Sequence, residues 1–85
     1  MNKRAFFVWV PEGEYRIMIW SKENFFVGKR KLEGRWEQTE LKYLKRGDFF
    51  KSFENDGKPV VFEDLSIFIA KSDPYKKDEI WSIDI

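Results

Sequence analysis

Apolar residues in this chain fall into short runs that clusters of turn-forming residues separate. Ala5–Val10 is an unbroken apolar run, mostly β-branched and aromatic, and Pro11–Glu14 ends it. Tyr15–Trp20 follows, with apolar side chains on both of its faces. Two such runs around a Pro/Gly cluster predict a β-hairpin, and the second run is typical of a central strand.

The middle of the chain supports two interpretations. Phe25–Leu32 and Arg35–Leu41 predict a second hairpin that turns at Glu33–Gly34. The alternation of apolar and polar residues is imperfect there, so a helix over residues 39–46 competes with the second strand. Gly47 suits the C-terminal cap of such a helix.

The last third predicts alternating strands and turns. A cluster of Asn, Asp and Gly favours a tight turn because these residues tolerate positive φ. A strand that ends at the terminus must be paired to be ordered. In chain order, the predicted strands and turns are Asp48–Phe53, the turn Glu54–Gly57, Lys58–Phe62, Leu65–Ala70, the turn Ser72–Asp78, and Glu79–Ile85.

Short strands at regular spacing predict a small barrel or a strongly bent antiparallel sheet. With 85 residues and no internal repeat or linker, we expect one domain over residues 1–85, mostly β, or α+β if residues 39–46 are helical. Aromatic residues make up 19% of the chain and supply its core. The period-two pattern predicts these core residues: Trp9, Ile17, Ile19, Phe62, Ile67, Ile69 and Trp81.

The composition argues against catalysis. The chain has no His and no Cys, which removes the commonest general base, thiolate nucleophiles, disulfides and almost all structural zinc sites. Residues 54–57 are too compressed for a calcium loop, so turn chemistry explains their acids better. We therefore expect a protein that is not an enzyme and that carries no metal or cofactor.

No targeting segment is visible at the start of the chain. The apolar run Ala5–Val10 is too short for a signal peptide, and no apolar stretch approaches the ~20 residues that span a bilayer. We expect a cytoplasmic protein with no membrane partner.

Charge is segregated along the chain. Residues 16–51 hold ten Lys or Arg against five acids, a balance of +5, whereas residues 52–85 hold four against eight, a balance of −4. The overall charge of +1 hides this difference. A basic stripe can bind phosphates, and an acidic patch can compete for a basic protein surface.

Basic and aromatic residues in the middle form the candidate binding site. Cations that follow a nucleic-acid backbone beside rings that stack on bases are typical of single-strand binding. The alternatives are a solvated face for the lysines and a core position for Trp36. The candidate nucleic-acid-binding residues around the expected turn are Lys29, Arg30, Lys31, Arg35, Trp36 and Phe25.

A second basic group follows in the chain. Lys42, Lys45 and Arg46 would share one flank of a helix at positions i, i+3 and i+4. They complete the candidate nucleic-acid-binding residues, although a solubilising face is the favoured alternative.

Residues 41–62 also carry a resemblance. The stretch Leu41–Phe50, with Gly47-Asp48 before a strand, and then Asn55–Val60 resembles small phage-encoded accessory proteins of the T4 type that have SH3-like barrels. The resemblance implies an SH3-like or open β-barrel. It also implies a viral protein acting in the host cytoplasm, where some such proteins are counter-defence inhibitors of host toxin ribonucleases.

Two functions are therefore expected. The first is a non-enzymatic protein that binds RNA or single-stranded nucleic acid through its basic and aromatic middle. The alternative is an inhibitor that binds and blocks a host toxin ribonuclease or another host protein, with RNA as a possible bridge. Attraction between the basic middle and the acidic end also predicts homo-oligomers.

Overall fold

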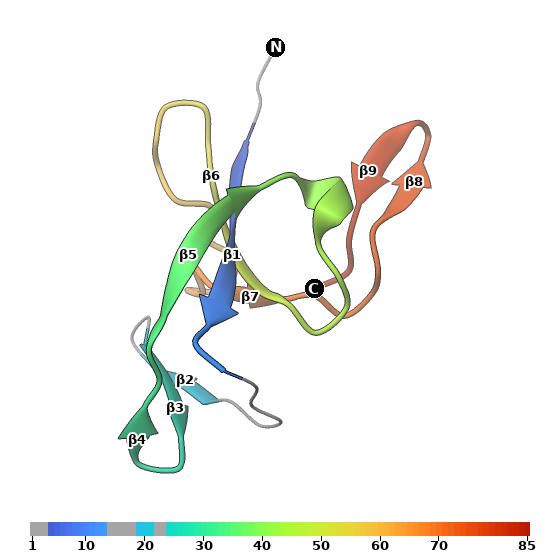
Figure 1. The fold of residues 1–85 in the computed structure, drawn as a ribbon. Helices are drawn as coiled ribbons and strands as arrows, with labels where there is room; N and C mark the ends of the chain where they lie inside the picture. The colour runs from blue at the N-terminus through green and yellow to red at the C-terminus, as the bar shows by residue number, and fades with distance from the viewer. Residues whose placement is uncertain (1–3, 14–18, 22–23) are drawn as a thin grey trace.

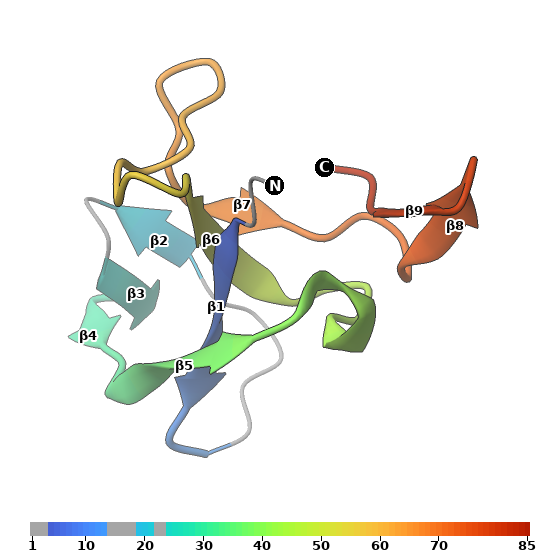
Figure 2. The ribbon, with the colours of Figure 1, turned by 90° about the horizontal axis from the view of Figure 1, so that it is seen from above.

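The computed structural model describes residues 4–13, 19–21 and 24–85. In these ranges the chain forms antiparallel strands and a single short 3-10 turn, arranged as Figures 1 and 2 show. The elements are β1 (Ala5–Pro11), β2 (Ile19–Ser21), β3 (Asn24–Val27), β4 (Arg30–Lys31), β5 (Gly34–Thr39), η1 (Leu41–Tyr43), β6 (Phe49–Phe53), β7 (Phe68–Ile69), β8 (Tyr75–Lys77) and β9 (Ile80–Ser82).

The main sheet has the strand order β5-β1-β6-β7. Trp9 of β1 lies opposite Trp36 of β5, and Val8 of β1 lies opposite Phe50 of β6. The strands β2, β3 and β4 form a second, smaller sheet, and β8 and β9 form a separate hairpin. The central strand β1 thus pairs with segments far away in the sequence on both sides.

Side chains of the main sheet enter two separate cores because successive residues of a strand point to opposite faces. On one face Phe25, Leu32, Phe49 and Ile67 are buried, with Trp9 and Trp36 packed against them. The Phe25 ring stacks on Trp9 with 4.5 Å between centroids. The small sheet therefore covers this face through Phe25, which explains why the run Ala5–Val10 is apolar at every position.

The opposite face carries a second core. Leu44, Phe50, Phe68 and Ala70 are buried there, and Phe6, Val8, Leu41, Val60 and Ile83 pack against them in part. Phe6 and Val8 belong to β1 of the main sheet, whereas Leu41, Val60 and Ile83, which cover that sheet, come from η1 and from irregular segments. Coverage of this face is therefore less complete.

The second hairpin turns at a different place from the one expected. The strands β3 and β4 are joined at Gly28–Lys29, where Gly28 has a φ of 61° that favours glycine. Gly34 instead begins β5, opposite Pro11. A Cβ on Gly34 would lie 2.6 Å from both the Trp9 ring and the Val10 carbonyl oxygen, so close packing rather than a turn requires glycine here.

The prediction of the first hairpin is wrong for residues 19–21, which pair elsewhere. Ile19 and Trp20 pair with Phe26 and Phe25 of β3 and not with the run Ala5–Val10. Residues 14–18 lie outside the described part of the chain. Long-range pairing of β1 with β5 replaces the local pairing because it brings Trp9 and Trp36 together, with ring centroids 5.4 Å apart.

Of the helix expected over residues 39–46, only the short 3-10 turn η1 is present. Leu44 is already extended, with a ψ of 160°. Asp48 stops the helix because its carboxylate accepts a hydrogen bond from the Lys45 backbone N–H at 2.8 Å. Leu41 and Leu44 still reach the core, but from a turn and an extended residue.

The C-terminal strands are shorter than expected. The turn at residues 54–57 is confirmed, and Glu54 donates a backbone hydrogen bond to Lys58 across it. Residues 75–77, expected in a turn, form β8, and the chain reverses at Asp78–Glu79 instead. The last strand ends at Ser82 and pairs with β8 rather than with the main sheet.

The expected core is confirmed in part. Ile67 is buried, and Trp9 and Ile69 pack against the same cluster. The assignment of Phe62 and Trp81 to the core is wrong. They are 57% and 40% exposed, because Phe62 lies in a loop and Trp81 in a projecting hairpin. Ile17 lies outside the described residues, and the side chain of Ile19 is not described either.

The mostly β fold with antiparallel strands is confirmed. In the described ranges 4–13, 19–21 and 24–85, no helix has the length and apolar character needed to cross a membrane.

Candidate functional site

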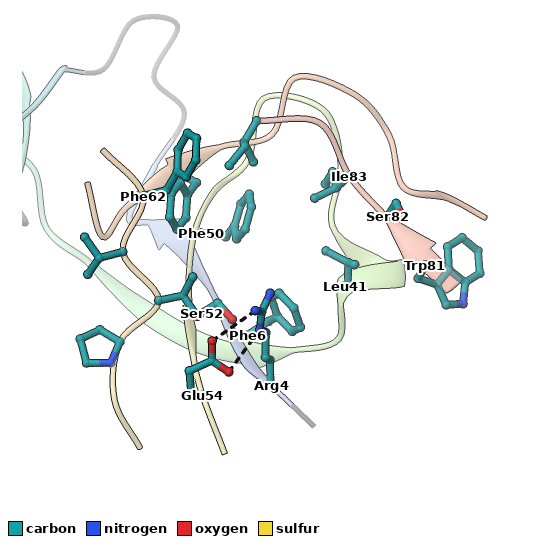
Figure 3. A pocket seen from close by; sticks show the side chains of 15 residues that line it. Arg4, Phe6, Leu41, Phe50, Ser52, Glu54, Phe62, Trp81, Ser82 and Ile83 are labelled. Carbon is teal, nitrogen blue, oxygen red and sulfur yellow. Dashed lines mark hydrogen bonds and ion pairs between the residues drawn. The ribbon is translucent and has the colours of Figure 1, made fainter. Parts of the chain in front are cut away.

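An open groove of about 640 Å³ lies on the less covered face of the main sheet (Figure 3). Phe6, Phe50 and Phe68 form its floor, and Leu41 and Ile83 close one side. The remaining lining residues are Arg4, Ser52, Glu54, Pro59, Val60, Val61, Phe62, Trp81, Ser82 and Ile85. Volumes of this order are typical of sites that take a small ligand or a few side chains of a partner.

The rim of the groove exposes large apolar side chains. Val61, Phe62, Trp81 and Ile85 line it, and each is at least 40% exposed. The apolar surface continues past Phe62 into a neighbouring hollow that Leu65 also lines. A contiguous apolar surface on a small protein marks an interaction site more often than a solvated face.

A tight turn positions one side of this rim. Phe62 and Leu65 exchange backbone hydrogen bonds at 3.0 Å in both directions. The two residues between them, Glu63 and Asp64, have φ values of 51° and 63°, as a type I′ turn requires. The turn therefore holds two apolar side chains beside two carboxylates.

The opposite side of the rim depends on hydrogen bonds of Asp84. Its carboxylate accepts a hydrogen bond from the Tyr75 hydroxyl at 2.8 Å, and its backbone N–H donates to the Ser72 hydroxyl at 3.1 Å. Lys71 donates a backbone hydrogen bond to the carbonyl oxygen of Asp84. These contacts fix the segment that carries Ile83 and Ile85.

The same hydrogen bond raises the pKa of Tyr75 above its ordinary value of 10.0. Partial desolvation and the negative charge of Asp84 act in the same direction, since all three disfavour the phenolate. Tyr75 is therefore a neutral hydrogen-bond donor at neutral pH.

The polar side chains that line the groove are those of Arg4, Ser52, Glu54 and Ser82. Arg4 and Glu54 form an ion pair at one end, with 3.2 Å between Nη2 and Oε1 (Figure 3). Ser52 is only 4% exposed, and its hydroxyl makes no hydrogen bond to any described residue. It shares the groove face with Phe50 because the two are separated by two positions in β6.

The residues of the expected basic site lie in separate parts of the fold. Lys29, Arg30 and Lys31 are exposed at the turn and strand that end the small sheet. Figures 1 and 2 both place this hairpin well apart from η1, where the second basic group begins. Within the described part of the chain, the two groups therefore lie in separate places.

The stacking residues are only partly available. Phe25 is 0% exposed, so its assignment as a base-stacking residue is wrong: it is the centre of a core. Trp36 is half-buried and packs against that core. The Lys51 ammonium, which the sequence did not single out, lies 4.4 Å from the Trp36 ring centroid and occupies that ring by a cation–π contact.

Several of the expected cations have acidic neighbours. Arg35 contacts Glu37 at 2.7 Å, and Lys42 contacts Glu40 at 3.6 Å. Lys45 and Arg46 are exposed but follow η1 in a loop. The expected helical flank of Lys42, Lys45 and Arg46 is therefore wrong, because only Lys42 lies in the turn.

The sequence pattern missed the groove. Phe62 and Trp81 were assigned to the core on their period-two spacing, although both belong to its rim. The signal that could have found them is the aromatic share of 19%, which exceeds what a chain of 85 residues can easily bury. In the described ranges, no group of three carboxylates is placed to hold a metal ion.

Comparisons of the chain with protein-family models, with curated proteins and with solved structures find no match. The resemblance of residues 41–62 to phage accessory proteins stays a prediction. Function must therefore be inferred from the surface of this chain.

Proposed function

We propose that this chain is a non-enzymatic protein that binds another protein through the apolar groove. This is the inhibitor-type function: a small domain that occupies a partner's surface and thereby blocks it. A host toxin ribonuclease is the partner class that the resemblance to phage accessory proteins implies.

The exposed apolar rim carries this proposal. Four large apolar side chains are exposed at one groove. Their exposure is unfavourable, because burial would contribute about 25 cal/mol of hydrophobic free energy per Å². A partner that covers Val61, Phe62, Trp81 and Ile85 recovers that free energy. Protein interfaces are enriched in such aromatic residues at their centre, with a polar rim around them.

Nucleic-acid binding is the second candidate, and one observation favours it. Lys29, Arg30 and Lys31 are exposed together on a single hairpin, where three cations can contact adjacent phosphates. The burial of Phe25 and the Lys51–Trp36 contact weaken this candidate. Without an accessible ring, the hairpin offers a charge contact and little stacking.

Affinity capture from a host-cell lysate tests the two candidates against each other. The bait is the full chain, compared with Val61→Ser/Phe62→Ser and with the control Tyr43→Ser, whose ring is 66% exposed but lies outside the groove. We expect wild type and Tyr43→Ser to retain the same protein after nuclease treatment and in high salt. The groove variant should lose it.

Two results would contradict the proposal. Equal capture by the groove variant would show that the apolar rim is not the contact. Loss of capture after nuclease treatment, together with loss in a Lys29→Glu/Arg30→Glu/Lys31→Glu variant, would favour the nucleic-acid candidate instead.

A further inference from the structure

Beyond its apolar character, the groove has a distinctive electrostatic surrounding. Its two hollows are lined by the cations Arg4 and Lys71 and by the acids Glu54 and Glu63. Arg4 is held by Glu54, so this pair contributes little net charge. Asp64 lies beside Glu63 at the tip of the turn.

Asp84 adds a further carboxylate between Ile83 and Ile85. Apart from the Arg4–Glu54 pair, Glu63 and Lys71 line the second hollow, and the Asp84 carboxylate accepts a hydrogen bond from Tyr75. At the rim, the Lys76 ammonium lies 5.3 Å from the centroid of the Trp81 ring. The surrounding residues 52–85 carry a balance of −4, as four basic residues stand against eight acids. A ligand that fits this surface is apolar at its centre and positively charged beside it.

The floor of the groove carries an independent sign of a ligand. The Ser52 hydroxyl is more than nine-tenths buried and has no hydrogen-bond partner among the described residues. A buried hydroxyl left unpaired is unfavourable, and a ligand N–H or carbonyl that reaches it removes the penalty. A polypeptide backbone supplies both groups beside its side chains.

We propose that the groove binds a short, basic and apolar segment of the partner protein. This inference rests on the proposed function and specifies its ligand. A large apolar side chain of the segment covers Phe50 and Phe68, and flanking Lys or Arg residues lie against Glu63 and Asp64. The segment's backbone provides the hydrogen bond that Ser52 lacks.

Selection from a randomised peptide library displayed on phage tests this proposal without knowledge of the partner. The bait is the full wild-type chain, and selected peptides are synthesised for affinity measurement. We expect enriched peptides to combine a Trp, Phe or Leu with adjacent Lys or Arg. Their binding should be lost in Val61→Ser/Phe62→Ser and kept in Tyr43→Ser.

A pair of matched variants isolates the charge. Glu63→Gln/Asp64→Asn removes two carboxylates from the turn at the rim. Asp78→Asn/Glu79→Gln removes two from a matched turn, in which two acidic residues also have positive φ and which lines neither hollow of the groove. We expect the first variant to bind the selected peptides roughly fivefold more weakly at low salt, and the second to bind like wild type.

A third variant tests the floor. Ser52→Ala removes the unpaired hydroxyl without opening a large cavity, so the free protein should be no less stable. Binding of the selected peptides should nevertheless weaken by roughly fivefold, because one hydrogen bond is lost. Unchanged affinity for every selected peptide would remove Ser52 from the site.

The outcomes separate this inference from the function on which it rests. Groove-dependent peptides that lack basic residues, or that the two charge variants affect equally, overturn the basic segment and leave protein binding in place. The basic segment is also overturned, and protein binding is kept, if no peptide is enriched and a second copy of this chain occupies the groove. Peptides whose binding survives Val61→Ser/Phe62→Ser contradict both proposals.

Discussion

The burial of each aromatic ring decides what it can do in this protein. Phe25 is completely enclosed by Trp9, Trp36 and Phe49, with ring centroids 4.5–6.0 Å away. Trp81 instead lies on a projecting hairpin with 40% of its surface exposed. The first ring stabilises the fold, and the second keeps an exposed surface at the groove rim, with the Lys76 ammonium 5.3 Å from its ring centroid.

We predict that Phe25→Ala costs about 3–5 kcal/mol of unfolding free energy, because it opens a cavity in a packed core. Trp81→Ala should cost only about 1–2 kcal/mol, since much of the ring is already in water. Denaturant unfolding followed by fluorescence measures both. A larger loss for Trp81→Ala than for Phe25→Ala would contradict the placement of the two rings.

Ser52 supports a second prediction at this scale. Its hydroxyl is buried without a partner, and such a group is unfavourable by about 1–3 kcal/mol. Ser52→Ala should therefore leave the free protein as stable as wild type or make it more stable. A fall in melting temperature of several degrees would show that the hydroxyl is hydrogen-bonded in solution.

At the scale of elements, strand content was easier to predict from the sequence than strand pairing. Asn55–Gly57 and the run Phe49–Phe53 were recognised because turn residues and β-branched or aromatic runs act locally. The pairing of β1 with β5 was missed because two-sided burial, not a local turn, selects that partner. The turn predicted at Gly34 was wrong for the same reason, because close packing and tight turns both require glycine.

The candidate site was harder still to predict from the sequence. The exposure of Lys29, Arg30 and Lys31 follows from their charge, and it was expected. The groove joins β1, β6, the turn at Glu63–Asp64 and the C-terminal segment, which only the tertiary structure brings together. No periodicity within one segment could have revealed it.

The C-terminal hairpin offers a pH-dependent prediction. In the folded state the pKa of Tyr75 is raised by its hydrogen bond to Asp84, so the contact stabilises the protein fully below the unfolded pKa near 10. This contribution is lost as the pH rises through the higher folded pKa. The hydrogen bond should therefore contribute its full stabilisation of the hairpin at neutral pH.

Absorbance titration of tyrosinate checks this contact. We expect Tyr75 of wild type to ionise at a higher pH than a free tyrosine side chain, and Tyr75→Phe to remove that step. Asp84→Ala should shift the step to lower pH. Identical titration curves for wild type and Asp84→Ala would show that the hydrogen bond is absent in solution.

At the scale of the whole molecule, opposite charges lie in different regions. The basic hairpin β3–β4 and the C-terminal hairpin β8–β9 are well separated in both views (Figures 1 and 2). The strand β5 is also an end of the main sheet, with β1 as its neighbour in the described chain. A second copy can therefore meet a complementary charge and an open strand edge.

We predict weak homo-oligomers that dissociate as salt is raised. Sedimentation velocity at about 100 μM, a level that detects micromolar to millimolar constants, measures the association. Val61→Ser/Phe62→Ser should associate like wild type, because the contact is electrostatic. A pure monomer at low salt would contradict the prediction.

The central claim is that a protein segment, and not nucleic acid, binds this chain at the apolar groove. An amide chemical-shift map of the full chain tests it most directly, recorded first with a peptide from the selection and then with a single-stranded RNA. We predict that the peptide shifts amides near Ser52, Phe62 and Ile83, and that RNA produces weaker shifts that salt abolishes. Shifts centred on Lys29–Lys31 for both ligands, with the groove unchanged, would contradict the account.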